Sequence, residues 1–287
     1  MQKLGYRSLS RAQYSLTGLV IFTIGFLITF SARLYLSSTQ TPQTEAVGAI
    51  DAIVEVALKL SLVLIPILFI KLIHREPLNR FGIAAGKTPF KHLAIGASTA
   101  LLWLFLNYLA LLSIFGFDVI TIRGWTYVQS PAWLFQFFHL LTLNSIGEEI
   151  ESRAYLQSVF SRATSIRGGI AVSAVLFGVG HVPINLYIYH SSAMTTVFNV
   201  TGAAIFGVVA GYLYAITGNI LASISLHSVW NVMQVSLPLQ IDIPTSTSFI
   251  MYVFTGAASL IILFIILALL ILLHRRKPHW LVKSEAT

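Results

Sequence analysis

The sequence has no cysteine and very little charge: Asp, Glu, Lys and Arg together make up 10% of its 287 residues. Without cysteine the chain cannot form disulfides, a thiolate nucleophile, or Cys-ligated zinc and iron–sulfur sites. So little charge, with 56% hydrophobic residues and a mean hydropathy of +0.81, lies outside the usual range of soluble globular domains. We therefore expect an integral membrane protein.

Acidic residues are the scarcer charged class, with 10 Asp and Glu against 18 Lys and Arg. An evenly spread basic surface would indicate an anionic partner such as nucleic acid. The basic residues instead cluster in 3–11, 71–91, 162–167 and 275–283, and these clusters alternate with loops almost free of positive charge. This is the positive-inside pattern of a polytopic membrane protein. It predicts both termini in the cytoplasm and no nucleic-acid partner.

Apolar stretches long enough to cross a bilayer, about 20 residues each, recur along the chain. We predict eight, near 15–36, 47–73, 93–115, 131–162, 168–190, 195–216, 218–236 and 248–274. The expected fold is an all-α polytopic membrane bundle of about eight transmembrane helices. No repeat or linker divides the chain, so we expect a single integral-membrane domain over 1–287. The missing cysteines and the absence of an organelle-targeting signal favour a multi-pass protein of the inner (plasma) membrane.

Charged residues are concentrated in the fourth predicted span, which contains Glu148, Glu149, Glu151 and Arg153. A charged side chain at bilayer depth costs at least roughly 2.5–3.5 kcal/mol, so such residues usually pair or serve a function. Glu149 and Arg153 are four apart and share a helix face, so they are expected to pair. Glu148 lies about 140° from Arg153 around the helix, which leaves it free to accept a proton. The alternative is that all four mark a cytoplasmic helix end.

Two further spans carry polar pairs at four-residue spacing. Phe177 and His181 lie in the fifth span, and His227 and Asn231 lie in the seventh. With a rise of 1.5 Å per residue, Glu148, His181 and Asn231 all fall about 20 Å from their cytoplasmic helix ends. Each histidine alone is better explained by packing than by function. Similar depth on three helices nevertheless predicts one shared polar cavity.

The second span holds Asp51, Glu55 and Lys59, again four residues apart. This spacing is that of a self-neutralising ladder on one helix face. We assign these residues a structural role.

Three ordered groups of residues on three different helices resemble the motifs of the CPBP family, which comprises CAAX prenyl endopeptidases and bacteriocin-processing enzymes and is also called the abortive-infection family. The groups are Glu148, Glu149 and Arg153, then Phe177 and His181, then His227 and Asn231. The resemblance covers about residues 131–235 and implies an all-helical intramembrane endopeptidase with its catalytic core in this segment.

The resemblance also implies roles for these residues. Glu148 would be the general base that activates water, assisted by His181. His227 and Asn231 would stabilise the oxyanion, and the orienting pair would be Glu149 and Arg153. Such an arrangement supplies what peptide hydrolysis needs, namely a proton acceptor, an ordered water and hydrogen-bond donors directed at the developing negative oxygen.

A metal ion is the main open point of this mechanism. Zinc takes His and carboxylate ligands, and Glu148, His181 and His227 are the residues that would hold it. We favour catalysis without a cofactor, and zinc is the alternative.

Other functions are compatible with the sequence. A non-catalytic membrane scaffold or a bacteriocin-immunity protein could keep the same fold and motifs, and a proton-coupled transporter could use intramembrane carboxylates. We favour an endopeptidase whose partners are the lipid bilayer and a membrane-associated peptide or protein substrate. The sequence fixes neither the substrate, whether prenylated or not, nor the oligomeric state.

Overall fold

The computed structural model describes residues 9–38, 45–84, 86, 88–115, 120–122, 143–236, 239–241, 261–262, 265–266 and 268. Helices make up nearly all of this part. The long helices are α1 (Arg11–Ser38), α2 (Glu45–Leu68), α3 (Pro89–Phe115), α7 (Ile166–Gly180), α8 (Ala193–Thr217) and α9 (Ile220–Ser236). Shorter helical segments are η1 (Phe69–His74), η2 (Leu78–Phe81), α5 (Ser145–Glu149), η5 (Ile150–Gln157), α6 (Ser158–Ala163) and η6 (Ile184–Ile188).

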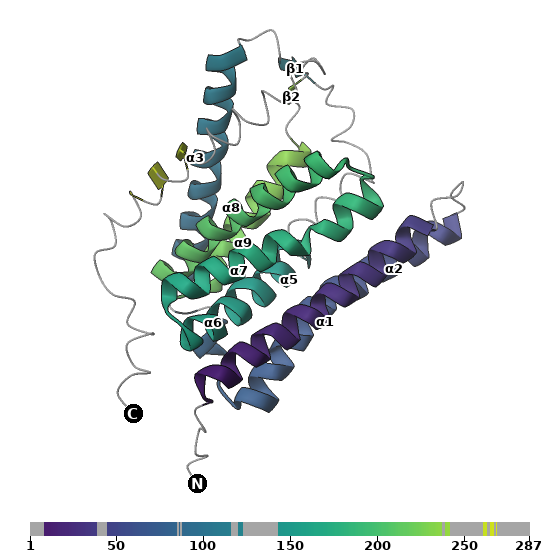
Figure 1. Ribbon diagram of the computed structural model, residues 1–287. Coiled ribbons are helices and arrows are strands. Elements are labelled where there is room, and N and C mark those ends of the chain that lie inside the picture. Colours follow the sequence, from purple (N-terminus) through teal and green to yellow (C-terminus); the bar gives the residue numbers. More distant parts are fainter. Residues whose placement is uncertain are drawn as a thin grey trace.

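The helix formed by α5, η5 and α6 lies inside the bundle. In Figure 1, α1 and α2 run side by side along one flank, while α7, α8 and α9 form the middle and α3 packs against α9. The α5–η5–α6 helix contacts α1 and α2 on one side and α7 and α9 on the other. The charged residues of the predicted fourth span are therefore carried by a helix surrounded by other helices.

The predicted spans correspond closely to helices where the structure describes them. Among the described residues, five helical segments are long and apolar enough to cross a membrane: Arg11–Ala32, Ile53–His74, Pro89–Ala110, Ile166–Ile188 and Ala193–Thr217. The seventh predicted span is the shorter apolar helix Ile220–Met233. The start of the fourth span and nearly all of the eighth lie outside the described residues. The total of eight, the single domain and the cytoplasmic termini thus stay predictions.

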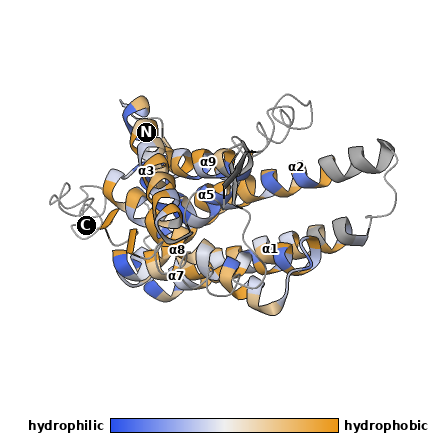
Figure 2. Cartoon of the chain, turned by 90° about the horizontal axis from the view of Figure 1, so that it is seen from above, coloured by the Kyte–Doolittle hydropathy of each residue, from blue (hydrophilic) through white to orange (hydrophobic). Residues whose placement is uncertain are grey.

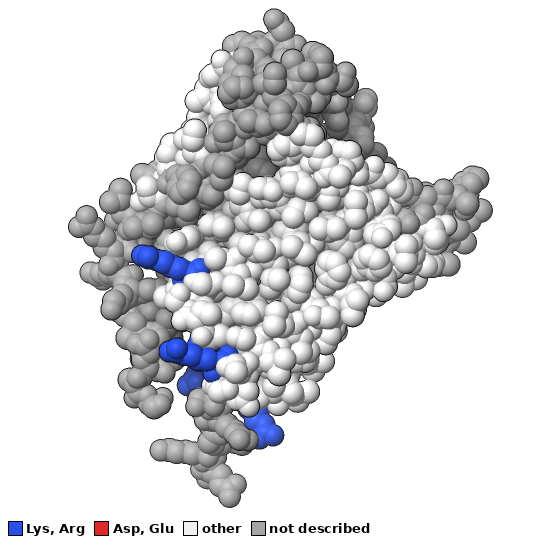
Figure 3. Space-filling model, viewed as in Figure 1, with Lys and Arg blue, Asp and Glu red and all other residues white. Residues whose placement is uncertain are grey.

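The surface of the bundle is apolar and carries little charge. Large side chains such as Leu72, Phe90 and Phe105 are exposed. Figure 2 shows that hydrophobic residues recur along the helices. On the face seen in Figure 3, the visible Lys and Arg side chains lie toward the lower left, and no Asp or Glu is visible. A wide uncharged belt suits a lipid environment, where charge is costly.

The turn between α8 and α9 anchors the start of α9. Gly218 has φ of 63°, in the left-handed region that glycine adopts without strain, and its N–H caps α8 by donating to Tyr214 O. The Asn219 side chain accepts from the N–H of Leu221 and donates to Ala84 O. These contacts tie α9 to the segment that follows η2.

The described part of the chain confirms the expected all-α fold class, apart from one pair of three-residue strands. β1 (Ile120–Ile122) and β2 (Leu239–Ile241) pair antiparallel, with Ile120 opposite Ile241. The strands belong to the predicted loops after α3 and after α9. Their pairing shows that these two loops meet at the same end of the bundle.

Candidate active site

A glycine of α5, Gly147, brings α2 close to the helix formed by α5, η5 and α6. A Cβ on Gly147 would lie 2.9 Å from the backbone oxygen of Lys59, so any larger residue there would push the two helices apart. Directly after Glu149 the helix changes to the wider π pattern of η5. Such widened turns are frequent at functional sites. The close approach of α2 sets the position of the Lys59 side chain.

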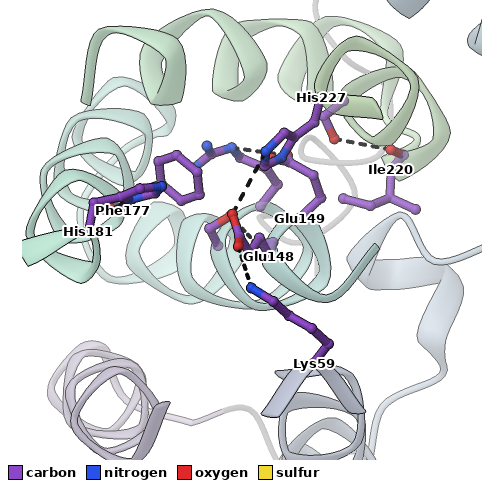
Figure 4. Close-up of polar contacts among 10 residues, drawn as sticks. Lys59, Glu148, Glu149, Phe177, His181, Ile220 and His227 are labelled. Atoms are coloured by element: carbon purple, nitrogen blue, oxygen red, sulfur yellow. Dashed lines mark hydrogen bonds and ion pairs between the residues drawn. The ribbon is translucent and has the colours of Figure 1, made fainter. Parts of the chain in front are cut away.

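Glu148 lies between a lysine and a histidine from two other helices. Lys59 Nζ, from α2, donates to Glu148 Oε1 at 2.7 Å. On the opposite side, His227 Nε2 of α9 is 3.8 Å from Glu148 Oε2, as Figure 4 shows. The Glu148 side chain keeps 16% of its surface exposed, whereas that of Glu149 has none. Glu148 is thus the accessible member of the pair.

Glu149 links the α5–η5–α6 helix to α9. His227 Nδ1 donates to Glu149 Oε1 at 2.9 Å, and Arg153 Nε lies 3.3 Å from Glu149 Oε2. The Arg153 guanidinium also covers the Phe177 ring at 4.7 Å from its centroid. Because a carboxylate can only accept, Nδ1 of the His227 ring carries the hydrogen and Nε2 faces Glu148. The pairing of Glu149 and Arg153 expected from their spacing is present.

His181 is held at the end of α7. Its Nδ1 donates to Phe177 O at 2.8 Å, which leaves Nε2 of the neutral ring as an acceptor. The His181 backbone oxygen accepts from Asn185 Nδ2 at 2.8 Å, and Asn199 Nδ2 of α8 donates to Asn185 Oδ1 at 2.6 Å. These bonds fix both the ring and the backbone of His181.

A cavity of about 410 Å³ lies next to these residues. His181, His227 and Asn231 are its main polar groups, and Asn199 adds a further amide. Most of its remaining wall is apolar, formed by Trp103, Phe177, Phe198, Ile205, Phe206 and Trp230. Asn231 Nδ2 is buried and has no hydrogen-bond partner in the described part of the chain. Ligand sites commonly combine such an apolar wall with a few placed polar groups.

The structure sorts the predicted site residues into two connected sets. Glu148, Glu149, Arg153 and His227 form one chain of contacts. His181 and Asn231 join His227 around the cavity. Glu151 belongs to neither set of contacts: it faces α1, where any side chain at Gly25 would collide with its carboxylate. The catalytic roles of the six candidates stay predictions.

Sequence reasoning assigned Lys59 only to a ladder along α2, and this assignment is incomplete. Its ammonium bonds to a carboxylate 89 positions along the chain, on another helix. The available signal was a lysine inside an apolar span, which by itself indicates function or pairing. Lys59 lies four residues after Glu55, and this spacing suggested a pair within α2 instead of a contact with another helix.

The fit of a zinc ion can be tested on Glu148, His181 and His227. Among the residues that the structure describes, no group of three His, Asp or Glu side chains has a spacing suited to a metal ion. The Lys59 ammonium already donates to Glu148, and its charge opposes a second cation at that carboxylate. As they are arranged, these side chains do not fit a zinc ion.

Comparison with known proteins adds a family to this geometry. Residues 129–233 match the family model described as type II CAAX prenyl endopeptidase Rce1-like. No curated protein matches the chain. The matched segment contains all three motif groups and the polar side chains around the cavity, including Asn199. Lys59, which donates to Glu148 from α2, lies outside it. Together with the five apolar helices, the match identifies a multi-pass membrane protein and supports a CAAX-type intramembrane endopeptidase. The resemblance to the CPBP family is thereby confirmed over residues 129–233, the segment that matches the Rce1-like family model.

Proposed function

We propose that this protein is an endopeptidase of the inner (plasma) membrane that hydrolyses peptide bonds of membrane-associated proteins or peptides with water activated by Glu148 and His181. The observation that supports the proposal most is the position of Glu148. Its carboxylate is accessible and lies 2.7 Å from Lys59 Nζ and 3.8 Å from His227 Nε2. His227 also lines the cavity. A substrate carbonyl in that cavity would lie beside both a proton acceptor and hydrogen-bond donors.

The chemistry follows from the hydrogen-bonding capacity of each group. A water between Glu148 and His181 Nε2 can donate one hydrogen to each. As its oxygen bonds to the carbonyl carbon, Glu148 takes one proton, and the carbonyl oxygen becomes negative. Asn231 Nδ2, which has no partner among the described residues, donates to this oxygen, as does His227 Nε2 when the ring is protonated. Glu148 then gives its proton to the leaving nitrogen as the C–N bond breaks, which regenerates the carboxylate.

Charge balance supports the same assignment. Glu148 and Glu149 carry two negative charges, and Lys59 and Arg153 carry two positive charges. When Glu148 accepts a proton the cluster gains one positive charge, just as the substrate oxygen gains a negative one. The cluster therefore stabilises the transition state more than the ground state, which is the condition for catalysis.

The proposal is tested in membranes, where no substrate needs to be known in advance. New peptide termini are compared by mass spectrometry in cells that express the parent, Glu148→Gln or Glu151→Gln. Glu151 lies on the same helix but faces α1, so it is a matched control. We expect the same new termini with the parent and with Glu151→Gln, and their loss with Glu148→Gln. The same new termini with Glu148→Gln as with the parent would contradict the proposed role of Glu148. No new termini with the parent would favour the non-catalytic scaffold or immunity protein.

A further inference from the structure

Lys59 is a buried cation from a helix that the family match does not include. The residue is 5% exposed, and its helix, α2, precedes the matched segment 129–233. Its ammonium donates to Glu148 Oε1, and Figure 4 shows it approaching Glu148 from the side opposite His227. One carboxylate oxygen is thereby engaged, and the other, Oε2, is directed toward His227.

The position of Lys59 is fixed by backbone packing. Gly147, next to Glu148, meets the Lys59 backbone oxygen so closely that a Cβ would lie 2.9 Å away. The same Cβ would also touch Leu62, one turn further along α2. The lysine therefore reaches Glu148 from a tightly packed helix contact and not from a mobile surface.

We propose that Lys59 is a positioning residue of the active site: its bond to Oε1 orients the Glu148 carboxylate so that Oε2 takes the proton of the attacking water. This inference rests on the proposed function and extends it, because it makes α2 a part of the catalytic apparatus. Lys59 also keeps Glu148 ionised beside Glu149, since two neighbouring carboxylates in a low-dielectric site need two cations. It acts through Glu148 and does not touch the substrate.

The kinetic test compares Lys59→Met, Lys59→Arg and Lys71→Met. Lys71 lies in η1, the continuation of α2, and is exposed, so its replacement removes the same charge without affecting Glu148. The probe is an internally quenched farnesylated CAAX peptide in detergent micelles, cleaved by purified protein. Because a misplaced catalytic group can cost about 10²-fold in rate, we expect kcat to fall by about that factor in Lys59→Met with KM nearly unchanged. Lys59→Arg should restore most of the rate, and Lys71→Met should match the parent.

A second measurement keeps the proposal falsifiable if Lys59→Met folds poorly or if this peptide is not cleaved. Thermal unfolding is measured for Lys59→Met, Glu148→Gln and the double variant. Each single variant leaves one buried charge unpaired, so the double variant should have a higher Tm than the sum of the two single shifts predicts. Additive shifts would overturn the proposal, because they would show that the two side chains do not interact.

The outcomes separate this inference from the proposed function. If Glu148→Gln is as active as the parent, the proposed function fails. If Glu148→Gln is inactive while Lys59→Met keeps the parent kcat, the proposed function stands and the positioning role of Lys59 is wrong.

Discussion

Arg153 provides the most demanding test of the packing around the site. Its side chain and that of Glu149 both have 0% exposure, and the Nε–Oε2 distance is 3.3 Å. Arg153→Met keeps the aliphatic volume but leaves the Glu149 carboxylate in the bundle interior with His227 alone. Removing one partner of a buried ion pair costs about 3–5 kcal/mol, because the remaining charge is desolvated and unpaired.

The expected shift in Tm can be derived from that cost. For chains of about this size each kcal/mol lowers Tm by roughly 2–4 °C, so Arg153→Met should unfold about 6–20 °C below the parent. Thermal unfolding in detergent, followed by circular dichroism, measures the shift. Arg167→Met is the matched control, because Arg167 is exposed near the start of α7.

A double-mutant cycle identifies the cause of the Arg153 effect. Adding Glu149→Gln to Arg153→Met removes the unpaired charge, so the two changes should be less than additive by about 1 kcal/mol or more. A Tm for Arg153→Met within about 2 °C of the parent, less than 1 kcal/mol on this scale, would refute the account of a buried pair.

Three further predictions concern the cavity and its chemistry. Asn231→Ala should lower kcat by about 10²–10³-fold with a nearly parental Tm, because it removes a donor to the oxyanion; a parental kcat in steady-state assays would remove Asn231 from the mechanism. Gly202→Leu should raise KM without lowering Tm, because Gly202 lines the cavity and a Cβ there meets nothing within 4 Å; an unchanged KM would mean that substrate binds elsewhere. Incubation with a chelator should leave peptide turnover unchanged, with less than one zinc per chain by metal analysis, whereas activity lost to the chelator and restored by zinc would establish metal catalysis.

Local spacing predicted the contacts made within one helix. The pairing of Glu149 with Arg153 followed from helical geometry, because both ends of the contact lie on the same segment. This contact survives although the helix takes the π form from Ile150, which the sequence did not predict. Hydropathy likewise located the helices that the structure describes, since a run of about 20 apolar residues is typical of a membrane-spanning helix.

Contacts between helices were not predictable in the same way. The bond from Lys59 to Glu148 depends on the approach of α2 to α5 at Gly147, and no periodicity within either helix encodes it. The orientation of His227, with Nδ1 on Glu149 and Nε2 toward Glu148, also requires the packed bundle. Similar helical depth predicted that polar groups from three helices would meet, but not which atoms would face each other.

The account depends on Glu148 as the group that takes the proton from water. The most direct test is the ratio of kcat for Glu148→Gln and Glu151→Gln on the same farnesylated peptide, with both proteins shown to be folded. We predict turnover near the parent rate for Glu151→Gln and none above background for Glu148→Gln. Equal turnover by the two variants would contradict the account.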